Sequence, residues 1–156
     1  MAEQSPVAVV TGASRGAGRG IALALGSHGC TVYVTGRSEK YGDSPLPGTI
    51  YETAERVTAA GGTGIALRVD HAVDEEVHAL FERVEREQGR LDILVNNACA
   101  IHDDLTAPGR FWEKSLGIAD MLDVGLRSSY VASYYAAPLM VSRRHGLIVF
   151  TSASGS

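Results

Sequence analysis

This sequence has few cysteines, no excess of basic charge and no long apolar run. Its 156 residues include two cysteines, Cys30 and Cys99, which are too few for a disulfide framework. Fourteen basic and eighteen acidic residues give a formal charge of −4, which argues against a nucleic-acid partner. Polar segments interrupt each apolar run before the roughly 20 residues that cross a bilayer, and the first residues do not resemble a signal peptide. We therefore expect a cytoplasmic protein that binds neither nucleic acid nor a membrane.

Short runs rich in valine and isoleucine alternate with helix-like stretches. The runs predicted as strands covered on both faces are residues 7–11, 31–35, 65–69, 92–96 and 147–151. The clearest helix prediction covers residues 73–88, with an apolar stripe that starts at Val73 and a stop at Gly89. Residues 38–48 contain too many helix breakers, so the second helix should start near Thr49 or Ile50. The alternation predicts one α/β domain, a doubly wound parallel sheet in the order 3-2-1-4-5.

A glycine-rich turn, called here the glycine corner, connects the first predicted strand to the first predicted helix, with the sequence TGASRGAG at residues 11–18. Glycine permits so tight a turn and leaves the N–H groups of a helix end open to a phosphate. A purely structural role for these glycines is the less favoured alternative. We expect the corner to contact a bound dinucleotide through Gly12, Ser14, Arg15, Gly16, Ala17 and Gly18.

The spacing Gly-x-x-x-Gly-x-Gly resembles that of the short-chain dehydrogenase/reductases, and three later landmarks extend the resemblance along nearly the whole chain. Asp70 resembles the family's adenine-contacting acid, Asn96-Asn97-Ala98 resembles the start of its Asn-Asn-Ala-Gly signature, and residues 146–156 resemble the strand leading to its catalytic serine. The resemblance implies a Rossmann-like fold in which residues 1–156 form one dinucleotide-binding domain, which we expect to be incomplete at its C-terminus. It also implies hydride transfer between a nicotinamide cofactor and a carbonyl or secondary alcohol of a small, partly apolar substrate.

The resemblance places Arg37 where the family distinguishes its two nicotinamide cofactors. A 2′-phosphate needs cations, whereas two free ribose hydroxyls favour a carboxylate. Arg37, together with Arg15 in the glycine corner, therefore predicts NADP. Two solvated surface arginines are the alternative, and the acidic Glu39 nearby leaves NAD open.

Other cofactor contacts follow from the same resemblance. Asp70 is expected to accept the adenine amino group with Val69 lining the ring, although Asp70 could also cap the next helix. Asn96 and Asn97 are expected to tie the central strands together while the backbone there, with Ala98, faces the ribose. Cys99 replaces the family's glycine, and a small buried apolar role is favoured over a reactive thiol.

The expected catalytic residue is Ser152, which fits the family's Ser-x-x-Gly motif, with Ser154 as a substitute and turn chemistry as the alternative. The family's proton donor is a tyrosine followed by lysine four residues later, and no tyrosine of this sequence has that spacing. Gly125 also stands where the family commonly has an asparagine that helps to hold a proton-relay water. A non-catalytic NADP-binding sensor or scaffold is therefore kept as an alternative to the enzyme.

The remaining expectations concern metal, substrate and assembly. Adjacent residues such as His102 and Asp103 cannot all face one ion, so no metal site is expected. Phe111 and Trp112 could line the substrate pocket or anchor their loop to the core. A homodimer or homotetramer is expected through an apolar face that could equally pack on the domain's own sheet, formed by Leu126, Tyr130, Tyr134, Tyr135 and Leu139.

Overall fold

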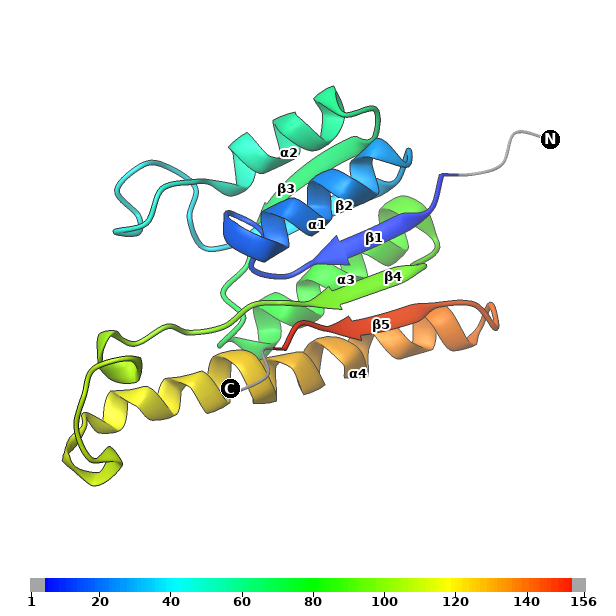
Figure 1. Cartoon of the computed structure of the whole chain (residues 1–156). Coiled ribbons are helices and arrows are strands. Elements are labelled where there is room, and N and C mark those ends of the chain that lie inside the picture. The colour runs from blue at the N-terminus through cyan, green and yellow to red at the C-terminus, as the bar shows by residue number, and fades with distance from the viewer. Residues whose placement is uncertain (1–4, 153–156) are drawn as a thin grey trace.

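The computed structural model describes residues 5–152, which form a five-stranded parallel sheet in the order β3-β2-β1-β4-β5 (Figure 1). The predicted fold and strand order are thus confirmed. The strands are β1 (Val7–Val10), β2 (Thr31–Gly36), β3 (Thr63–Arg68), β4 (Ile93–Asn96) and β5 (Leu147–Phe150). The helices are α1 (Gly16–Ser27), α2 (Ile50–Ala59), α3 (Asp74–Gln88) and α4 (Ser128–Val141).

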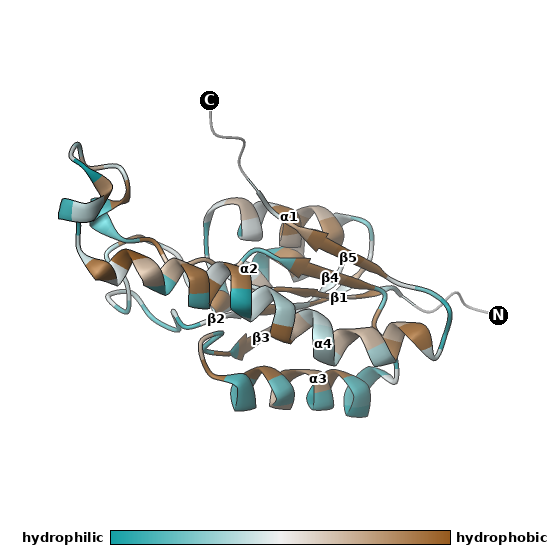
Figure 2. Ribbon diagram, turned by 90° about the horizontal axis from the view of Figure 1, so that it is seen from below, coloured by the Kyte–Doolittle hydropathy of each residue, from teal (hydrophilic) through white to brown (hydrophobic). Residues whose placement is uncertain are grey.

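Two layers of helices cover the sheet because successive side chains of each strand point to opposite faces. Val7 and Val9 of β1 belong to the core cluster beneath α3 and α4, whereas Ala8 and Val10 belong to the cluster beneath α1 and α2. Figure 2 shows the strands as strongly apolar elements and the outer face of α3 as hydrophilic. This two-sided burial explains the continuous apolar runs in the sequence.

The helix boundaries agree closely with the expectations except at the start of α3. Thr49 caps α2, its hydroxyl accepting a hydrogen bond from the backbone N–H of Glu52 at 3.0 Å. Gly89 ends α3 in a left-handed conformation with φ 63°. Val73 is not part of the buried stripe, since it lies at the N-cap with 38% of its surface exposed, and the buried side chains of α3 begin at Val77.

The connection between β4 and α4 is long, as expected, and consists of short helical turns rather than a regular helix. They are Asp103–Leu105, Phe111–Glu113, Leu116–Ala119 and Leu122–Arg127, the last kinked at Val124 and Gly125. Phe111 and Trp112 pack edge to face on each other, yet are 82% and 66% exposed. They therefore do not anchor this connection to the core.

Helix α4 divides the apolar face that was predicted for assembly. Tyr135 and Leu139 pack against the core cluster. Leu126, Tyr130 and Tyr134 are 70%, 71% and 64% exposed. Among the described residues, none of the helices has both the length and the apolar character needed to cross a bilayer.

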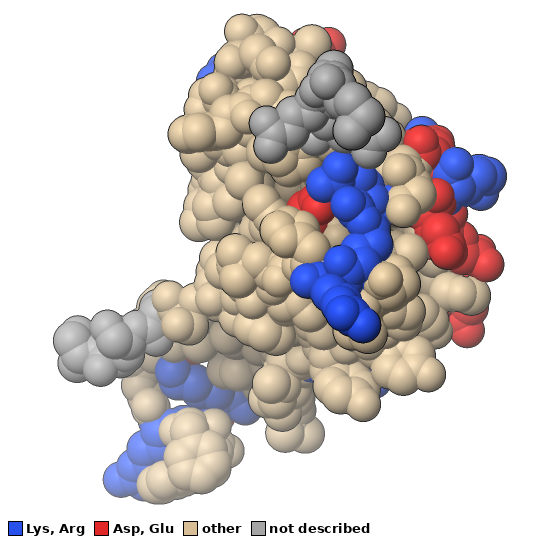
Figure 3. Space-filling model, turned by 90° about the vertical axis from the view of Figure 1, so that its right-hand side faces the viewer, with Lys and Arg blue, Asp and Glu red and all other residues tan. Residues whose placement is uncertain are grey.

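A buried carboxylate joins the strands at the ends where they begin, the side of the molecule shown in Figure 3, on which basic side chains gather. Asp92 accepts hydrogen bonds from Nε and Nη2 of Arg90 at 2.8 and 2.7 Å and from the N–H of Val7 at 2.8 Å. Arg143 lies 3.8 Å from it. Burial raises the pKa of Asp92, but the hydrogen bonds of Arg90 and Val7 outweigh this effect and hold that pKa below its ordinary value.

Candidate cofactor site

The site lies at the carboxyl ends of the strands, where β1 is flanked by β2 on one side and β4 on the other (Figure 1). The connection from β1 runs to β2 on one side, whereas the connection from β3 crosses to β4 on the other side of β1. In open α/β sheets such a reversal of strand order opens a ligand crevice. The glycine corner follows β1 directly and leads into α1. The sequence therefore brings its predicted phosphate-binding turn to the expected edge of the sheet.

The glycines of the corner have different surroundings. A Cβ on Gly12, which has φ +64°, would lie 2.7 Å from Cα of Ala98, and a Cβ on Gly18 would lie 2.4 Å from Nδ2 of Asn97. Gly16 has φ +57° and open space around its Cβ position. Two glycines thus allow close packing against the end of β4, and the third keeps the start of α1 bare and exposed.

The N-terminus of α1 has no side chain that caps its N–H groups and no acidic residue in its first turn, unlike the N-termini of α2 and α3. Arg15, its N-cap, makes no side-chain hydrogen bond to the helix, and the first turn contains no acidic residue. By contrast, Thr49 caps α2, and α3 begins with Asp74, Glu75 and Glu76. The free N–H groups and positive dipole end of α1 therefore fit the phosphates of a dinucleotide.

The end of β4 is tied to the corner by a compact hydrogen-bond network. The Thr11 hydroxyl accepts from the backbone N–H of Asn97 and of Ala98, both at 2.9 Å. Asn97 Nδ2 donates to the carbonyls of Thr11 and Gly12, each at 3.0 Å. The expectation that Asn97 ties central strands together is confirmed, whereas Asn96 instead joins β4 to α4 through Ser133 at 3.1 Å.

Comparison with known proteins agrees with this geometry. The sequence model of the family described as short chain dehydrogenase matches residues 6–156. The chain belongs to this family. The short chain dehydrogenases are oxidoreductases that use NAD or NADP, so the nucleotide role of the glycine corner agrees with the family.

The chain spans about half the length of the curated relatives it matches. Dehydrogenase/reductase SDR family member 1 of Mus musculus is 46% identical over 153 residues, which are 96% of this chain and 46% of the mouse protein. A short chain dehydrogenase from Mycobacterium thermoresistibile superposes with a TM-score of 0.84 at 29% identity, covering 97% of this chain and 52% of that structure. A metagenomic short-chain oxidoreductase in complex with NADP has a TM-score of 0.80 at 30% identity, over 96% and 63%.

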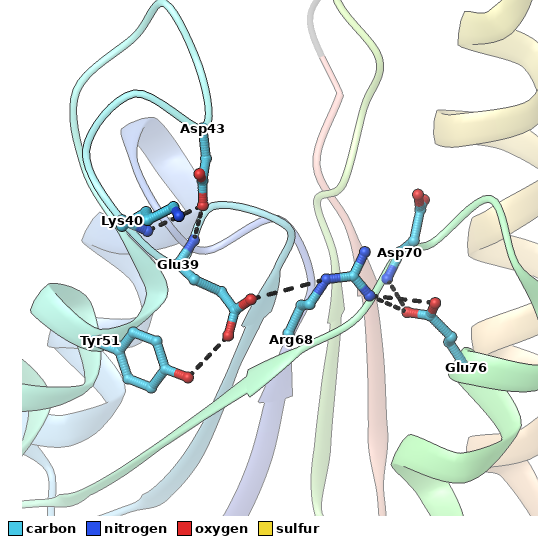
Figure 4. A network of polar contacts seen from close by, with 7 residues as sticks. All are labelled: Glu39, Lys40, Asp43, Tyr51, Arg68, Asp70 and Glu76. Atoms are coloured by element: carbon cyan, nitrogen blue, oxygen red, sulfur yellow. Dashed lines mark hydrogen bonds and ion pairs between the residues drawn. The ribbon is translucent and has the colours of Figure 1, made fainter.

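In this short chain dehydrogenase, Asp70 lies just after β3 and is held from several sides (Figure 4). Its N–H donates to Oε2 of Glu76 at 2.7 Å, and Oε2 also accepts from Arg68 at 3.0 Å. The Asp70 carboxylate accepts from the N–H of Ala72 at 3.0 Å and lies 3.8 Å from Arg37. Asp70 thus closes the turn before α3 but does not cap that helix, whose N-cap is Val73, so the capping alternative is wrong. The Asp70 side chain remains 23% exposed.

The residues on either side of Asp70 are buried. Val69 is 1% exposed and belongs to the core cluster, so its side chain does not lie on the surface where an adenine ring was expected. His71 is 4% exposed, and its Nε2 lies 2.9 Å from the Thr35 hydroxyl. Burial lowers the pKa of His71 to about 4, so its imidazole is neutral at pH 7.

Both predicted phosphate cations belong to the surroundings of the connection between β2 and α2, Arg37 by its position and Arg15 by its side-chain contacts. Arg37 follows β2 directly, with 68% of its side chain exposed. The Arg15 guanidinium donates to the Ser38 hydroxyl at 2.6 Å, to the Ser44 hydroxyl, and to the Gly48 carbonyl at 3.0 Å. Arg15 therefore reaches from the glycine corner to the residue that follows Arg37.

The predicted catalytic end is described only as far as Ser152, which is exposed after β5. The N–H of Thr151 donates to the Asn96 carbonyl at 3.0 Å, so β5 brings Ser152 beside the end of β4. Ser154, the predicted substitute, lies outside the described residues. Cys99 is exposed, so the expected buried role is wrong, and Gly125 lies near it with φ +155° in the kink before α4.

Several residues that shape the site carry no local signal of their role in the sequence. The Thr11 hydroxyl ties the corner to the end of β4, and Glu76 reaches back from α3 to Asp70 and Arg68. Ser44 had no signal beyond its place among helix breakers. The described residues contain no cluster of three or more His, Cys, Asp or Glu suited to a metal ion, and His102 Nδ1 instead accepts from the N–H of Asp104 at 3.1 Å.

Proposed function

We propose that this chain binds NADP(H) and serves hydride transfer between that cofactor and a carbonyl or secondary alcohol. The observation that carries the proposal is the bare glycine corner at the uncapped N-terminus of α1, with two arginines beside it. The diphosphate would contact the glycine corner at Gly12, Ser14, Gly16, Ala17 and Gly18. Arg15 and Arg37 would meet the 2′-phosphate.

The polar contacts at the adenosine end support NADP over NAD. Glu39 is the acidic residue that could have favoured NAD. Its carboxylate accepts a hydrogen bond from the Tyr51 hydroxyl at 3.0 Å and lies 4.0 Å from Arg68 (Figure 4). Its carboxylate is thus engaged rather than free for two ribose hydroxyls. The likeness to the NADP-bound metagenomic oxidoreductase points the same way.

When bound, the cofactor supplies the hydride at its nicotinamide ring. We assign to Ser152 the task of donating a hydrogen bond to the substrate oxygen, and to Asn97 and Ala98 the task of shaping the ribose wall. The family's proton donor, a Tyr-x-x-x-Lys pair, is not among the 156 residues. Because the chain covers about half of its relatives' length, we propose the complete reaction for a protein in which that pair follows Ser152.

The binding proposal is tested by titrating NADP and NAD into the chain. We expect Arg37→Ala to weaken NADP by about tenfold, since one charge-assisted contact to phosphate is lost, and to leave NAD nearly unchanged. Arg86→Ala, an exposed arginine on α3, is the matched control. Tighter binding of NAD than of NADP, or an unchanged NADP affinity in Arg37→Ala, would contradict the proposal.

A non-catalytic NADP-binding sensor or scaffold is the second candidate, and Gly125 favours it. This residue stands where the family usually has an asparagine, and glycine has no side chain that could hold a water. Hydride transfer by a natural protein that continues into Tyr-x-x-x-Lys would favour the enzyme. Tight NADP binding without turnover in that protein would favour the sensor. For either function we propose the cytoplasm, where reducing conditions suit the two free cysteines.

A further inference from the structure

The connection between β2 and α2 is a folded segment rather than an open loop. Connections in α/β units commonly have about 2–6 residues, whereas this one includes the whole of residues 38–48, here called the strap. Within it, Oδ2 of Asp43 accepts from the backbone N–H of Glu39 at 2.9 Å and of Lys40 at 3.0 Å (Figure 4). The Ser44 hydroxyl accepts from the N–H of Leu46 at 3.2 Å. The strap therefore has hydrogen bonds of its own.

The strap is attached to the glycine corner by one side chain. Arg15 donates to Ser38 near the start of the strap, to Ser44 in its middle and to the Gly48 carbonyl at its end. These residues lie 23, 29 and 33 positions along the chain from Arg15. One guanidinium thus joins three parts of the strap to the turn that precedes α1.

Close backbone packing also attaches the end of the strap to the glycine corner. Gly48 has φ +107°, and a Cβ there would lie 2.4 Å from the Ser14 carbonyl oxygen and 3.4 Å from Cβ of Arg15. Gly48 and Ser38 are both buried. The strap consequently rests on the corner and does not extend away from it.

The hydrogen-bond acceptors that the strap offers to Arg15 are not anions, so its positive charge can still attract a phosphate. All three are neutral oxygen atoms, two hydroxyls and one carbonyl, whereas Arg37 lies 3.8 Å from the Asp70 carboxylate. Neutral acceptors orient a guanidinium without cancelling its positive charge. A side chain that is already oriented also loses less rotamer entropy when an anion binds.

We propose that Ser38 and Ser44 are positioning residues, which hold Arg15 ready for a 2′-phosphate and so set the preference of this chain for NADP over NAD. This inference rests on the proposed function, in which the chain binds NADP. The two hydroxyls act through Arg15 and do not have to touch the cofactor. Their removal should therefore change selectivity between the two cofactors rather than nucleotide binding in general.

The test measures dissociation constants of NADP and NAD by calorimetry for the chain and its serine variants. In Ser44→Ala and in the double variant Ser38→Ala/Ser44→Ala, NADP should bind about three- to tenfold more weakly, the range expected when a hydrogen bond to a charged group is lost. NAD should stay within about twofold. Ser44→Thr keeps the hydroxyl and should restore NADP affinity. The control is Ser27→Ala, which removes an exposed hydroxyl that is bonded to the Ala24 carbonyl at the far end of α1.

The outcomes separate this inference from the proposed function. If Arg15→Ala lowers the preference for NADP but both alanine variants of the strap keep it, the positioning role is overturned and NADP binding stands. Tighter NADP binding in Ser44→Ala would also overturn it, because the strap would then compete with the phosphate for Arg15. An equal loss of NADP and NAD would reveal a merely structural role. If the unaltered chain does not prefer NADP, the proposed function fails and the inference fails with it.

Discussion

Gly18 and Gly20 lie two positions apart on α1, but their surroundings differ sharply. A Cβ on Gly18 would lie 2.4 Å from Asn97 Nδ2 and 2.6 Å from the Gly12 carbonyl oxygen. A Cβ on Gly20 would meet no atom within 4 Å. Identical residues on one helix therefore carry different constraints, and only Gly18 packs against the end of β4.

Alanine substitution should separate the two positions. We expect Gly18→Ala to lower the free energy of unfolding by about 1–3 kcal/mol because the added methyl overpacks the contact with β4. NADP affinity should fall with it. Gly20→Ala should raise stability by up to about 1 kcal/mol because alanine favours the helix. Urea unfolding of both variants is the measurement, and a stable Gly18→Ala protein with full NADP affinity would contradict the packing argument.

The buried His71 makes the stability of the fold depend on pH. Burial is the main cause of its lowered pKa, which Asp70 and Glu76 partly offset by favouring the charged form, whereas Arg37 lowers it further. The folded value of about 4 lies below the ordinary 6.5, so the unfolded chain binds the proton first. This contribution to stability is present above pH 6.5 and is lost as pH falls towards 4.

The expected result is a free energy of unfolding that declines by up to about 3 kcal/mol between these pH values through His71 alone. His71→Gln should flatten that part of the profile even if it lowers stability at pH 7, so the slope against pH is the quantity to compare. His28→Gln replaces an exposed histidine and serves as control. An unchanged slope in His71→Gln would refute the assignment.

Asp92 joins three strands at the start of the sheet. Its N–H donates to the Val7 carbonyl at 2.9 Å, its side chain accepts from the Val7 N–H, and its carbonyl accepts from the N–H of Leu147 at 2.8 Å. The residue is 3% exposed and is bonded to Arg90 through both carboxylate oxygens. It therefore holds β1, β4 and β5 in register at the ends where the strands begin, opposite the glycine corner.

Asp92→Asn should lower the free energy of unfolding by about 3 kcal/mol, because it removes one partner of a buried ion pair. The matched control is Asp74→Asn, which disrupts the exposed pair of Asp74 with Arg127 between α3 and the turn before α4. Solvent screens this second pair, so its loss should cost much less. Equal effects of the two substitutions in urea unfolding would contradict the role given to Asp92.

The described domain leaves one apolar face of α4 open to solvent. Tyr130, Tyr134 and Val141 are 71%, 64% and 72% exposed, and Leu126 before the helix is 70% exposed. Exposed apolar area of this kind is typical of interfaces between proteins. We keep the expectation of a homodimer or homotetramer through this face, without Tyr135 and Leu139, which are partly buried against the core.

The assembly prediction is tested by sedimentation of the chain and of Tyr130→Arg/Tyr134→Arg. We expect the unaltered chain to associate and the double variant to be monomeric, because two charges would have to be buried at the interface. Leu46→Arg changes an exposed apolar residue of the strap and should leave the association intact. A monomeric unaltered chain would contradict the prediction.

The strand order, the edge of the sheet that carries the site and the glycine corner were all predictable from the sequence. Each depends on a local pattern: buried strands read as apolar runs, and glycine spacing reports a turn that other residues cannot make. Even the start of α2 followed from Thr49, because an N-cap is a contact between near neighbours. Such features can be predicted from the sequence because they involve residues that are only a few positions apart.

Other features were decided only when distant segments packed together. The attachment of Arg15 to the strap, the exposure of Cys99, the burial of Val69 and the division of the α4 face depend on contacts between residues far apart in sequence. Local periodicity tells which residues are apolar but not which neighbour covers them. Side-chain direction and burial follow from the packing of whole layers, so these contacts emerge only in the folded chain.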